Sequence, residues 1–203
     1  MNLISFGNYK IMTVLQPSDI EIWTDIKWYV LKVKEDKALL MSKDCLLWEL
    51  YDADNTLPIE AYPCPWEKSY LREILNGRVY EEAFTDEEKR VILPANALKD
   101  KMYLLDMEEL DAYFPDIELR KAETIIADDS DGRVFISREP SVWWINSVGS
   151  ESNQMSVIHY DGTLDRNGMG VYCDEVGVRP VIWVETQALA ELKRTTVERL
   201  FGK

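Results

Sequence analysis

The sequence is poor in the residues that most catalytic and metal centres use. It has one histidine, His159, and three cysteines, Cys45, Cys64 and Cys173, which lie far apart. No CxxC pair occurs, so the ligand spacing of a zinc site is missing, and an odd number of cysteines is a poor basis for a disulfide framework. We therefore expect no metal, no cofactor and no catalytic residue. Free thiols are typical of a reducing compartment, which favours the cytoplasm.

The sequence also lacks a long apolar run and an excess of basic residues. No stretch of 18 apolar residues occurs, so we expect no transmembrane helix. The N-terminal MNLISFGNYKIM lacks the basic and apolar regions of a secretion signal, although a leader already removed would leave no trace. With 37 acidic and 23 basic residues the net charge is −14, which disfavours nucleic acid and anionic membranes as partners. A basic protein or a cation suits this charge better, although the charge also serves solubility.

The length of 203 residues suits one domain, which we place at residues 1–185, with a C-terminal helical extension at 186–203. The segment LISFGNYKIMTVL predicts an edge or hairpin strand. Apolar runs at Trp28–Val33 and Ala38–Met41 predict a hairpin around Lys34–Lys37, with Trp28 and Val30 on one face and Tyr29, Leu31 and Val33 on the other.

Three short amphipathic helices are expected between the strands. The first covers WEKSYLREILNG and ends at Asn76-Gly77, a typical helix stop. The second begins with a capping box of Thr85 and Glu88, ahead of Lys89–Leu93. The third begins at Asp106, with a glutamate at 109, and stops before Pro115. In the C-terminal extension, Leu189, Leu192, Val197 and Leu200 form an incomplete apolar stripe, which either docks on the domain or reaches a partner and makes an oligomer.

Two patterns that suggest a site do not survive inspection. ADDSDGRVFIS resembles a calcium loop, but Ala127 and Arg138 stand where ligands belong, so a turn before the strand 133–137 is the better interpretation. His159 lies in SVIHYDGTLDR, the strongest hairpin signal of the chain, with no serine or cysteine nucleophile motif beside it. We interpret it as a strand residue.

A series of motifs resembles a bacterial domain of unknown function, family 6273. The matching segments are Phe6-Gly7-Asn8-Tyr9, Trp28–Leu31, Trp66–Asn76, Ala83-Phe84-Thr85 with Glu88, Tyr103–Glu109, Trp143–Ser147 and Val176–Pro180. The resemblance covers about residues 3 to 184, and the order of the motifs is more specific than any single one. The resemblance implies an α+β protein with a C-type-lectin-like fold, in which twisted antiparallel sheets and short flanking helices support a face of long loops. It implies a binding scaffold more than an enzyme.

The departures from known relatives of that fold argue against its specific chemistries. Asn146 replaces the arginine expected in W-W-L-R-S. Glu139-Pro140-Ser141 and Trp144-Ile145-Asn146 are near misses of the tripeptides that calcium-dependent lectins use for sugars. Formylglycine-generating enzymes need two close cysteines, whereas Cys173 stands alone in its region.

The most plausible contacts lie in the loops after Trp144, at 149–155 and 165–175, because function usually sits on polar loops of a rigid sheet. The tentative ligand-binding residues are Trp144, Asn146, Asn153, Asp165, Arg166, Asn167 and Tyr172. One of Trp143 and Trp144 should be buried, while the other either faces out, where it could form a stacking platform, or lies under a loop. Arg179 and Arg72 are expected to pair internally with carboxylates.

The leading hypothesis is therefore a non-enzymatic domain that binds a protein or carbohydrate partner through these loops. Two alternatives remain open. One is an enzyme of the formylglycine-generating type that uses Cys173. The other is a structural subunit of a phage or surface assembly, held through the C-terminal helix.

Overall fold

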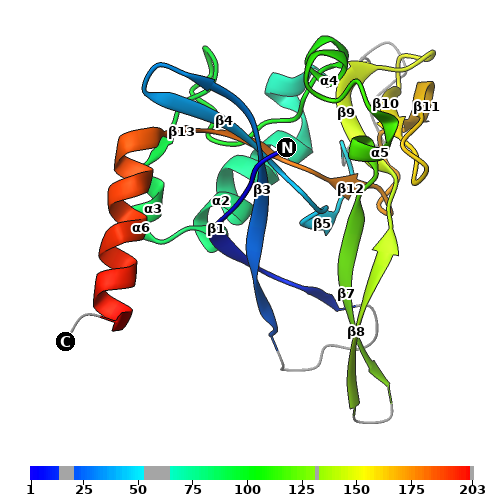
Figure 1. The fold of residues 1–203 in the computed structure, drawn as a ribbon. Coiled ribbons are helices and arrows are strands. Elements are labelled where there is room, and N and C mark those ends of the chain that lie inside the picture. Colours follow the sequence, from blue (N-terminus) through cyan, green and yellow to red (C-terminus); the bar gives the residue numbers. More distant parts are fainter. Residues whose placement is uncertain (14–20, 53–64, 131–132, 202–203) are drawn as a thin grey trace.

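The computed structural model describes residues 1–13, 21–52, 65–130 and 133–201, which form three sheets flanked by short helices (Figure 1). The central sheet has the order β1-β3-β4-β13-β6 and every neighbouring pair is antiparallel. Its strands are β1 (Leu3–Lys10), β3 (Trp23–Lys34), β4 (Lys37–Ser42), β13 (Val181–Glu185) and β6 (Ile92–Leu93). The expected edge position of the first strand and the hairpin around 34–37 are confirmed.

A second sheet and a protruding hairpin lie beside the central sheet. The second sheet has the order β11-β10-β9-β12-β5, with β9 and β12 parallel. Its strands are β11 (Leu164–Gly170), β10 (Gln154–Ile158), β9 (Trp143–Val148), β12 (Gly177–Val178) and β5 (Leu47–Trp48). The third sheet joins β2 (Met12–Thr13) to β7 (Glu123–Ser130) and β8 (Arg133–Pro140), and its last two strands extend from the body as an arm (Figure 1). This mixed, mostly antiparallel architecture confirms the α+β prediction.

The central sheet is covered on both faces, and the continuous apolar sequence of β4 is consistent with this. Leu40 packs into one hydrophobic cluster, while its neighbours Leu39 and Met41 pack into another on the opposite face. Successive strand residues point to opposite faces, so a continuous apolar run is what a doubly covered strand requires. The same alternation puts Trp28 and Val30 against one cluster and Tyr29 and Leu31 against the other, as expected. Val33 lies on an exposed end of β3.

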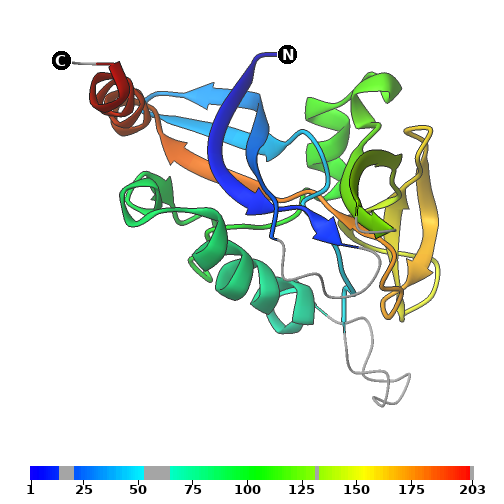
Figure 2. The same ribbon diagram turned by 90° about the horizontal axis from the view of Figure 1, so that it is seen from below.

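One face is covered by a helical rod that is longer than predicted (Figure 2). A 3-10 turn (η2, Trp66–Lys68) leads into α1 (Tyr70–Ile74), a π-helical segment (η3, Leu75–Val79) and α2 (Tyr80–Ala83). The prediction that the helix stops at Asn76-Gly77 is wrong. Asn76 instead fastens the rod to the next segment: its side-chain amide donates to the carbonyls of Arg72 and Met102, and its Oδ1 accepts from the amides of Lys101 and Met102.

The other predicted helix starts are confirmed. Thr85 and Glu88 form a capping box at α3 (Asp86–Lys89), and Asp106 and Glu109 form one at α4 (Met107–Tyr113). The predicted continuation of α3 to Leu93 is wrong, because the helix ends at Lys89 and Ile92–Leu93 is β6. A further helix, α5 (Ile117–Arg120), follows Pro115. α4 covers the second face of the central sheet, where Leu110 and Phe114 join the cluster of Leu39 and Met41.

The C-terminal segment forms α6 (Thr186–Phe201), which follows β13 directly. Thr186 donates from its amide and its hydroxyl to the carbonyl of Asp36 in the β3–β4 turn. Leu189 belongs to the core cluster and Leu192 packs against it. The start of α6 is therefore docked on the domain; the side chains of Val197 and Leu200 lie outside the described part of the chain.

Candidate functional site

Both tryptophans at the start of β9 are buried, which contradicts the tentative assignment of Trp144 as a ligand-binding residue. Trp144 is 0% exposed and donates from its Nε1 to the Glu49 carbonyl at 2.9 Å. Trp143 is 1% exposed and donates to the Arg120 carbonyl, also at 2.9 Å. The two indoles point to opposite sides of β9, and each side meets a hydrophobic cluster. Trp144 thus offers no stacking surface.

The polar end of β9 reaches the surface directly after these tryptophans. Asn146 accepts a hydrogen bond on its Oδ1 from the Tyr51 hydroxyl at 2.9 Å, and its backbone N–H donates to the Leu105 carbonyl. The Ser147 hydroxyl accepts from the amide of Met107, the first residue of α4, at 3.1 Å. These bonds hold the end of β9 against the N-terminal turn of α4.

An open groove of about 530 Å³ lies between α4, the end of β9 and β11. It is lined by Asp106, Met107, Glu108, Asp111, Asn146, Ser147 and Arg166, and we call it the α4 groove. Two of the predicted binding residues, Asn146 and Arg166, come together here. Arg166 extends from β11 across the groove, and its guanidinium contacts the sulfur of Met107.

Carboxylates dominate the charge of the α4 groove. Asp106, Glu108 and Asp111 against Arg166 give three negative charges and one positive, a balance of −2 among the lining residues. Asp106 is engaged in capping α4, and Asp111 pairs with Arg120 at 3.1 Å. Glu108 is exposed and points its charge at solvent. The groove suits a positively charged group, with Met107 as an apolar contact beside it.

Sequence reasoning missed the acidic wall of this groove. It used Asp106 and Glu109 only as helix-capping residues. The sequence did contain one indication, the acidic first turn of α4, in which Glu108 has no capping role. The sequence does not show, however, that this turn lies beside Asn146. That neighbourhood is set by tertiary packing.

None of the remaining predicted residues lines the α4 groove. Asp165 lies 3.4 Å from His159 and accepts from the Asn167 amide. The Asn153 carbonyl accepts from the Val171 amide, and the Asn167 carbonyl accepts from the Ser150 amide. Tyr172 is half exposed. Three of these residues thus use their backbone or side chain to hold the hairpin and its loops.

The stretch predicted as a loop at 165–175 is half strand. Residues 165–170 belong to β11, which pairs with β10, and only the part after Gly170 is irregular. The register shifts between Met155 and Val157, and Gly168 (φ +81°) lies so close to the Met155 carbonyl that a Cβ would not fit. This bulge lets the hairpin continue where the polar sequence suggests that it ends. The hairpin itself is confirmed, with His159 just after β10 rather than within it.

Arg179 is fully buried and pairs with no carboxylate among the described residues, so the predicted internal ion pair is wrong. Its Nε donates to the Ser42 carbonyl at 3.1 Å and its Nη1 to the Arg120 carbonyl at 3.2 Å. The guanidinium lies over the Trp143 ring at 4.5 Å and the Phe114 ring at 5.7 Å. Arg72 does pair as expected, at 2.7 Å from the buried carboxylate of Asp100.

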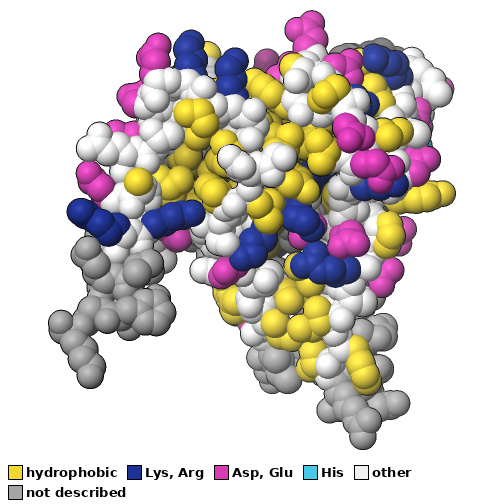
Figure 3. Space-filling view, in the orientation of Figure 1, with side chains coloured by type: hydrophobic (Ala, Val, Ile, Leu, Met, Phe, Trp, Pro, Cys, Tyr) yellow, Lys and Arg dark blue, Asp and Glu magenta, His cyan; other side chains and the backbone are white. Residues whose placement is uncertain are grey.

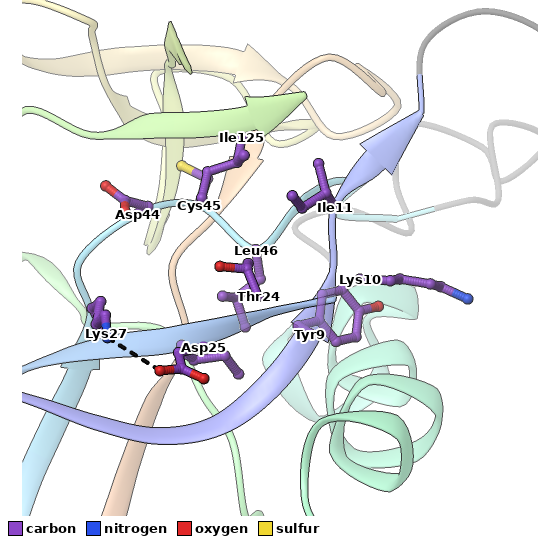
Figure 4. A pocket seen from close by; sticks show the side chains of 11 residues that line it. Tyr9, Lys10, Ile11, Thr24, Asp25, Lys27, Asp44, Cys45, Leu46 and Ile125 are labelled. Atoms are coloured by element: carbon purple, nitrogen blue, oxygen red, sulfur yellow. Dashed lines mark hydrogen bonds and ion pairs between the residues drawn. The ribbon is translucent and has the colours of Figure 1, made fainter. Parts of the chain in front are cut away.

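A second hollow, of about 30 Å³, lies between β1, β3 and the segment before β5 (Figure 4). Lys27 pairs with Asp25 at 3.3 Å near it, and Cys45 lines its inner wall. Burial raises the pKa of the Cys45 thiol to about 12, so this thiol stays protonated at neutral pH. The hollow has room for a water molecule rather than a substrate.

The described cysteines do not form a pair. Cys45 belongs to the cluster on the α4 side of the central sheet, whereas Cys173 packs against the cluster on the other side, and both are free. Cys64 lies outside the described residues. In the described ranges, no three histidine, cysteine, aspartate or glutamate side chains come together as a metal ion would require. None of the described helices is long and apolar enough to cross a membrane.

Comparison with known families agrees with the motifs from Trp66 to Pro180 and does not extend to those at 6–9 and 28–31. Residues 35–186 match the model of the family described as Domain of unknown function (DUF6273). The chain belongs to this family. No curated protein and no solved structure matches it. The DUF6273 match begins in the β3–β4 turn and ends at the first residue of α6, so β1 and the whole of β3 lie outside the match although they pair into the same sheet.

Several segments of the DUF6273 chain that carry the motifs serve packing. Trp66 donates from its Nε1 to Asp100, and Asn76 joins the helical rod to residues 101–102. Gly177 faces the Cys45 sulfur so closely that a Cβ there would lie 2.4 Å from it. The α4 groove differs from these segments, because its carboxylates and Arg166 lie at the surface and do not pack in the core.

Proposed function

We propose that this DUF6273 chain is a non-enzymatic binding domain whose contact site is the α4 groove. Its ligand would be a basic segment of a protein partner, with a lysine or arginine side chain beside Glu108 and Asp111. The observation that carries the proposal is the meeting of Asn146 and Arg166 with three carboxylates in one open groove.

The construction of the groove supports a binding role. Its walls come from a strand end and a capped helix that are tied to each other by Ser147 and Asn146. Rigid support of this kind limits the entropy lost when a ligand is held. Exposed ion pairs contribute only about 0.2–1 kcal/mol each, so a stable complex needs several of them and the apolar Met107 surface as well. A peptide or protein segment can supply such a set.

A carbohydrate ligand is a weaker proposal, because sugars favour an exposed aromatic ring and Trp144 is buried. The C-type-lectin-like relationship also belongs among our proposals. Its support is the division between a central sheet with covering helices and a second sheet that carries the loops at 149–153 and 171–176.

The test compares two charge-matched double variants of the full chain. Glu108→Gln with Asp111→Asn removes two charges from the groove, while Asp86→Asn with Glu87→Gln removes two exposed charges from α3. Native complexes would be purified with each protein as bait and quantified by mass spectrometry. We expect a partner that the groove variant loses at least tenfold and that the α3 variant retains.

The isolated partner would then be titrated by calorimetry at 50 and 300 mM NaCl. Affinity should fall with salt, since the contacts are ion pairs near the surface. Equal recovery of every partner by both variants would show that the groove is not the contact site.

A further inference from the structure

The arm ends in a strand that nothing in the described structure covers. β7 is shielded, with Thr124, Ile126 and Ala127 buried, but every residue of β8 from Val134 to Pro140 is exposed. In the order β2-β7-β8, the last strand pairs on one side only, among the residues that the structure describes. Its outer row of backbone amides and carbonyls therefore has no strand beside it.

This edge carries the most concentrated exposed apolar surface of β8. Val134, Phe135 and Ile136 are consecutive and are 39%, 55% and 58% exposed. Consecutive strand residues point to opposite faces, so packing against one side of the arm would cover only part of this set. Hydrophobic side chains are visible along the arm in Figure 3.

The usual protection of an edge strand is missing at the centre of β8. Natural edges carry charged residues, proline or bulges that block another strand. Here Arg138, Glu139 and Pro140 lie at the end nearest the body, and the eight residue pairs of β7 with β8 run without a register shift. The segment Val134–Ser137 is thus a regular, uncharged edge, and its first three residues are apolar.

We propose that this edge binds a second copy of the chain, with the two β8 strands antiparallel about a two-fold axis. The dimer would continue the sheet through β2-β7-β8 of one protomer and β8-β7-β2 of its partner. A strand edge paired with itself is self-complementary in its backbone hydrogen bonds, which is the arrangement of an isologous interface.

Charge favours a second copy over a charged partner. The chain carries −14, so two copies repel over most of their surface. From Val134 to Pro140, however, β8 has one arginine and one glutamate, a balance of zero. Arg138 is already held by Asp44 at 3.0 Å and Glu123 at 3.3 Å. Antiparallel pairing also puts the two bodies at opposite ends of the shared sheet, where their repulsion is smallest.

The dimer has a salt dependence opposite to that of a complex with a basic partner. Salt screens the repulsion between two acidic bodies and leaves the apolar contact intact, so dimerisation should strengthen between 50 and 500 mM NaCl. Sedimentation velocity of the full chain over a range of concentrations measures this directly. We expect a reversible monomer–dimer equilibrium whose dissociation constant falls as salt rises.

Single substitutions test the surface. Ile136→Lys and Phe135→Lys each put a charge into the edge, and we expect either to raise the dimer dissociation constant at least tenfold. Val33→Lys is the matched control, because Val33 is also exposed (63%) and lies on the central sheet. Thermal unfolding of each variant, with a melting temperature within a few degrees of the parent, shows that the fold is retained.

Three results would overturn the proposal. The first is a monomer at every concentration and salt. The second is a dimer that Ile136→Lys and Phe135→Lys leave unchanged, which would move the interface to another surface such as α6. The third is a dimer that salt weakens.

Discussion

At the scale of single residues, the most unusual side chain is Arg179. A buried charge normally has a counter-ion, because desolvation of an ion is costly. Here two carbonyls and two aromatic faces replace the counter-ion, and Nη2 is buried without a hydrogen-bond partner in the part of the chain that the structure describes. The planar guanidinium suits these partners, since it stacks on rings and donates in several directions at once.

Replacing Arg179 by lysine should therefore destabilise the fold although the charge is kept. Lysine loses the stacking on Trp143 and at least one carbonyl hydrogen bond, and we expect the free energy of unfolding to fall by about 2 kcal/mol. Urea denaturation measures the change. Arg90→Lys, at an exposed position, is the control and should change stability by less than about 0.5 kcal/mol. Equal effects of the two substitutions would contradict this role for the guanidinium.

Asp100 gives a prediction about pH. Burial raises the pKa of its carboxyl, but the hydrogen bonds from Arg72, Asn96 and Trp66 outweigh that effect and lower the pKa below its usual value. A pKa that is lower in the folded than in the unfolded chain stabilises the fold above about pH 4, and this contribution is lost as the pH falls through the folded value.

Asp100→Asn should cost about 2–3 kcal/mol at pH 7, because Arg72 loses its counter-charge at a partly buried site. The difference in unfolding free energy between parent and variant should shrink steadily below pH 4. Other carboxyl groups titrate in both proteins, so they cancel in the difference. A difference that stays constant from pH 7 to pH 2.5 would exclude the assigned ion pair.

At the scale of elements, sequence signals predicted helix starts correctly where the hydrogen bonds join residues close in sequence. The capping boxes at Thr85 and Asp106 are local, and both were predicted correctly. The predicted helix end at Asn76-Gly77 was wrong because the Asn76 side chain forms hydrogen bonds with residues 101–102, which are distant in sequence. The α4 groove could not be predicted for the same reason: Asn146, Arg166 and the acidic turn of α4 meet only after the sheets have packed.

The two glycines in these elements should respond oppositely to alanine. Gly77 lies within the helical rod, and a Cβ there meets nothing within 4 Å, so Gly77→Ala should stabilise by up to about 1 kcal/mol. At Gly168, φ is +81° and a Cβ would lie 2.3 Å from the Met155 carbonyl, so Gly168→Ala should destabilise by more than about 1 kcal/mol. Guanidinium denaturation of both variants tests the pair, and changes of the same sign would contradict it.

At the scale of the whole molecule, the main lesson is that the central sheet has two covered faces. The sequence predicts the β3–β4 hairpin and the alternation of its side chains, but it does not show how many layers pack on them. Strand β9 of the second sheet also has a hydrophobic cluster on each side, which is why both Trp143 and Trp144 are buried. Because both sides of β9 are covered, one of them by α4 and its neighbours, the tryptophans of this strand cannot contact a ligand. The exposed polar surface lies at the end of the strand.

The charge of the whole chain should also limit its stability in dilute buffer. A net charge of −14 on a 23.6 kDa chain implies self-repulsion in the folded state, and the unfolded chain relieves it by expanding. Raising NaCl from 10 to 300 mM shortens the Debye length from about 30 Å to below 10 Å. We expect the free energy of unfolding to rise with this change, most steeply below 100 mM.

Two controls separate screening from other effects of salt. Sodium and potassium chloride at equal ionic strength should act alike, because screening does not depend on the cation. The variant with Asp86→Asn and Glu87→Gln has a net charge of −12 and should gain less from salt than the parent, since it starts with less repulsion. Measurements must be made at protein concentrations where sedimentation shows one species, so that dimerisation through β8 does not contribute. A stability that falls with salt would mean that ion pairs such as Arg72–Asp100 outweigh the repulsion among the 37 acidic residues.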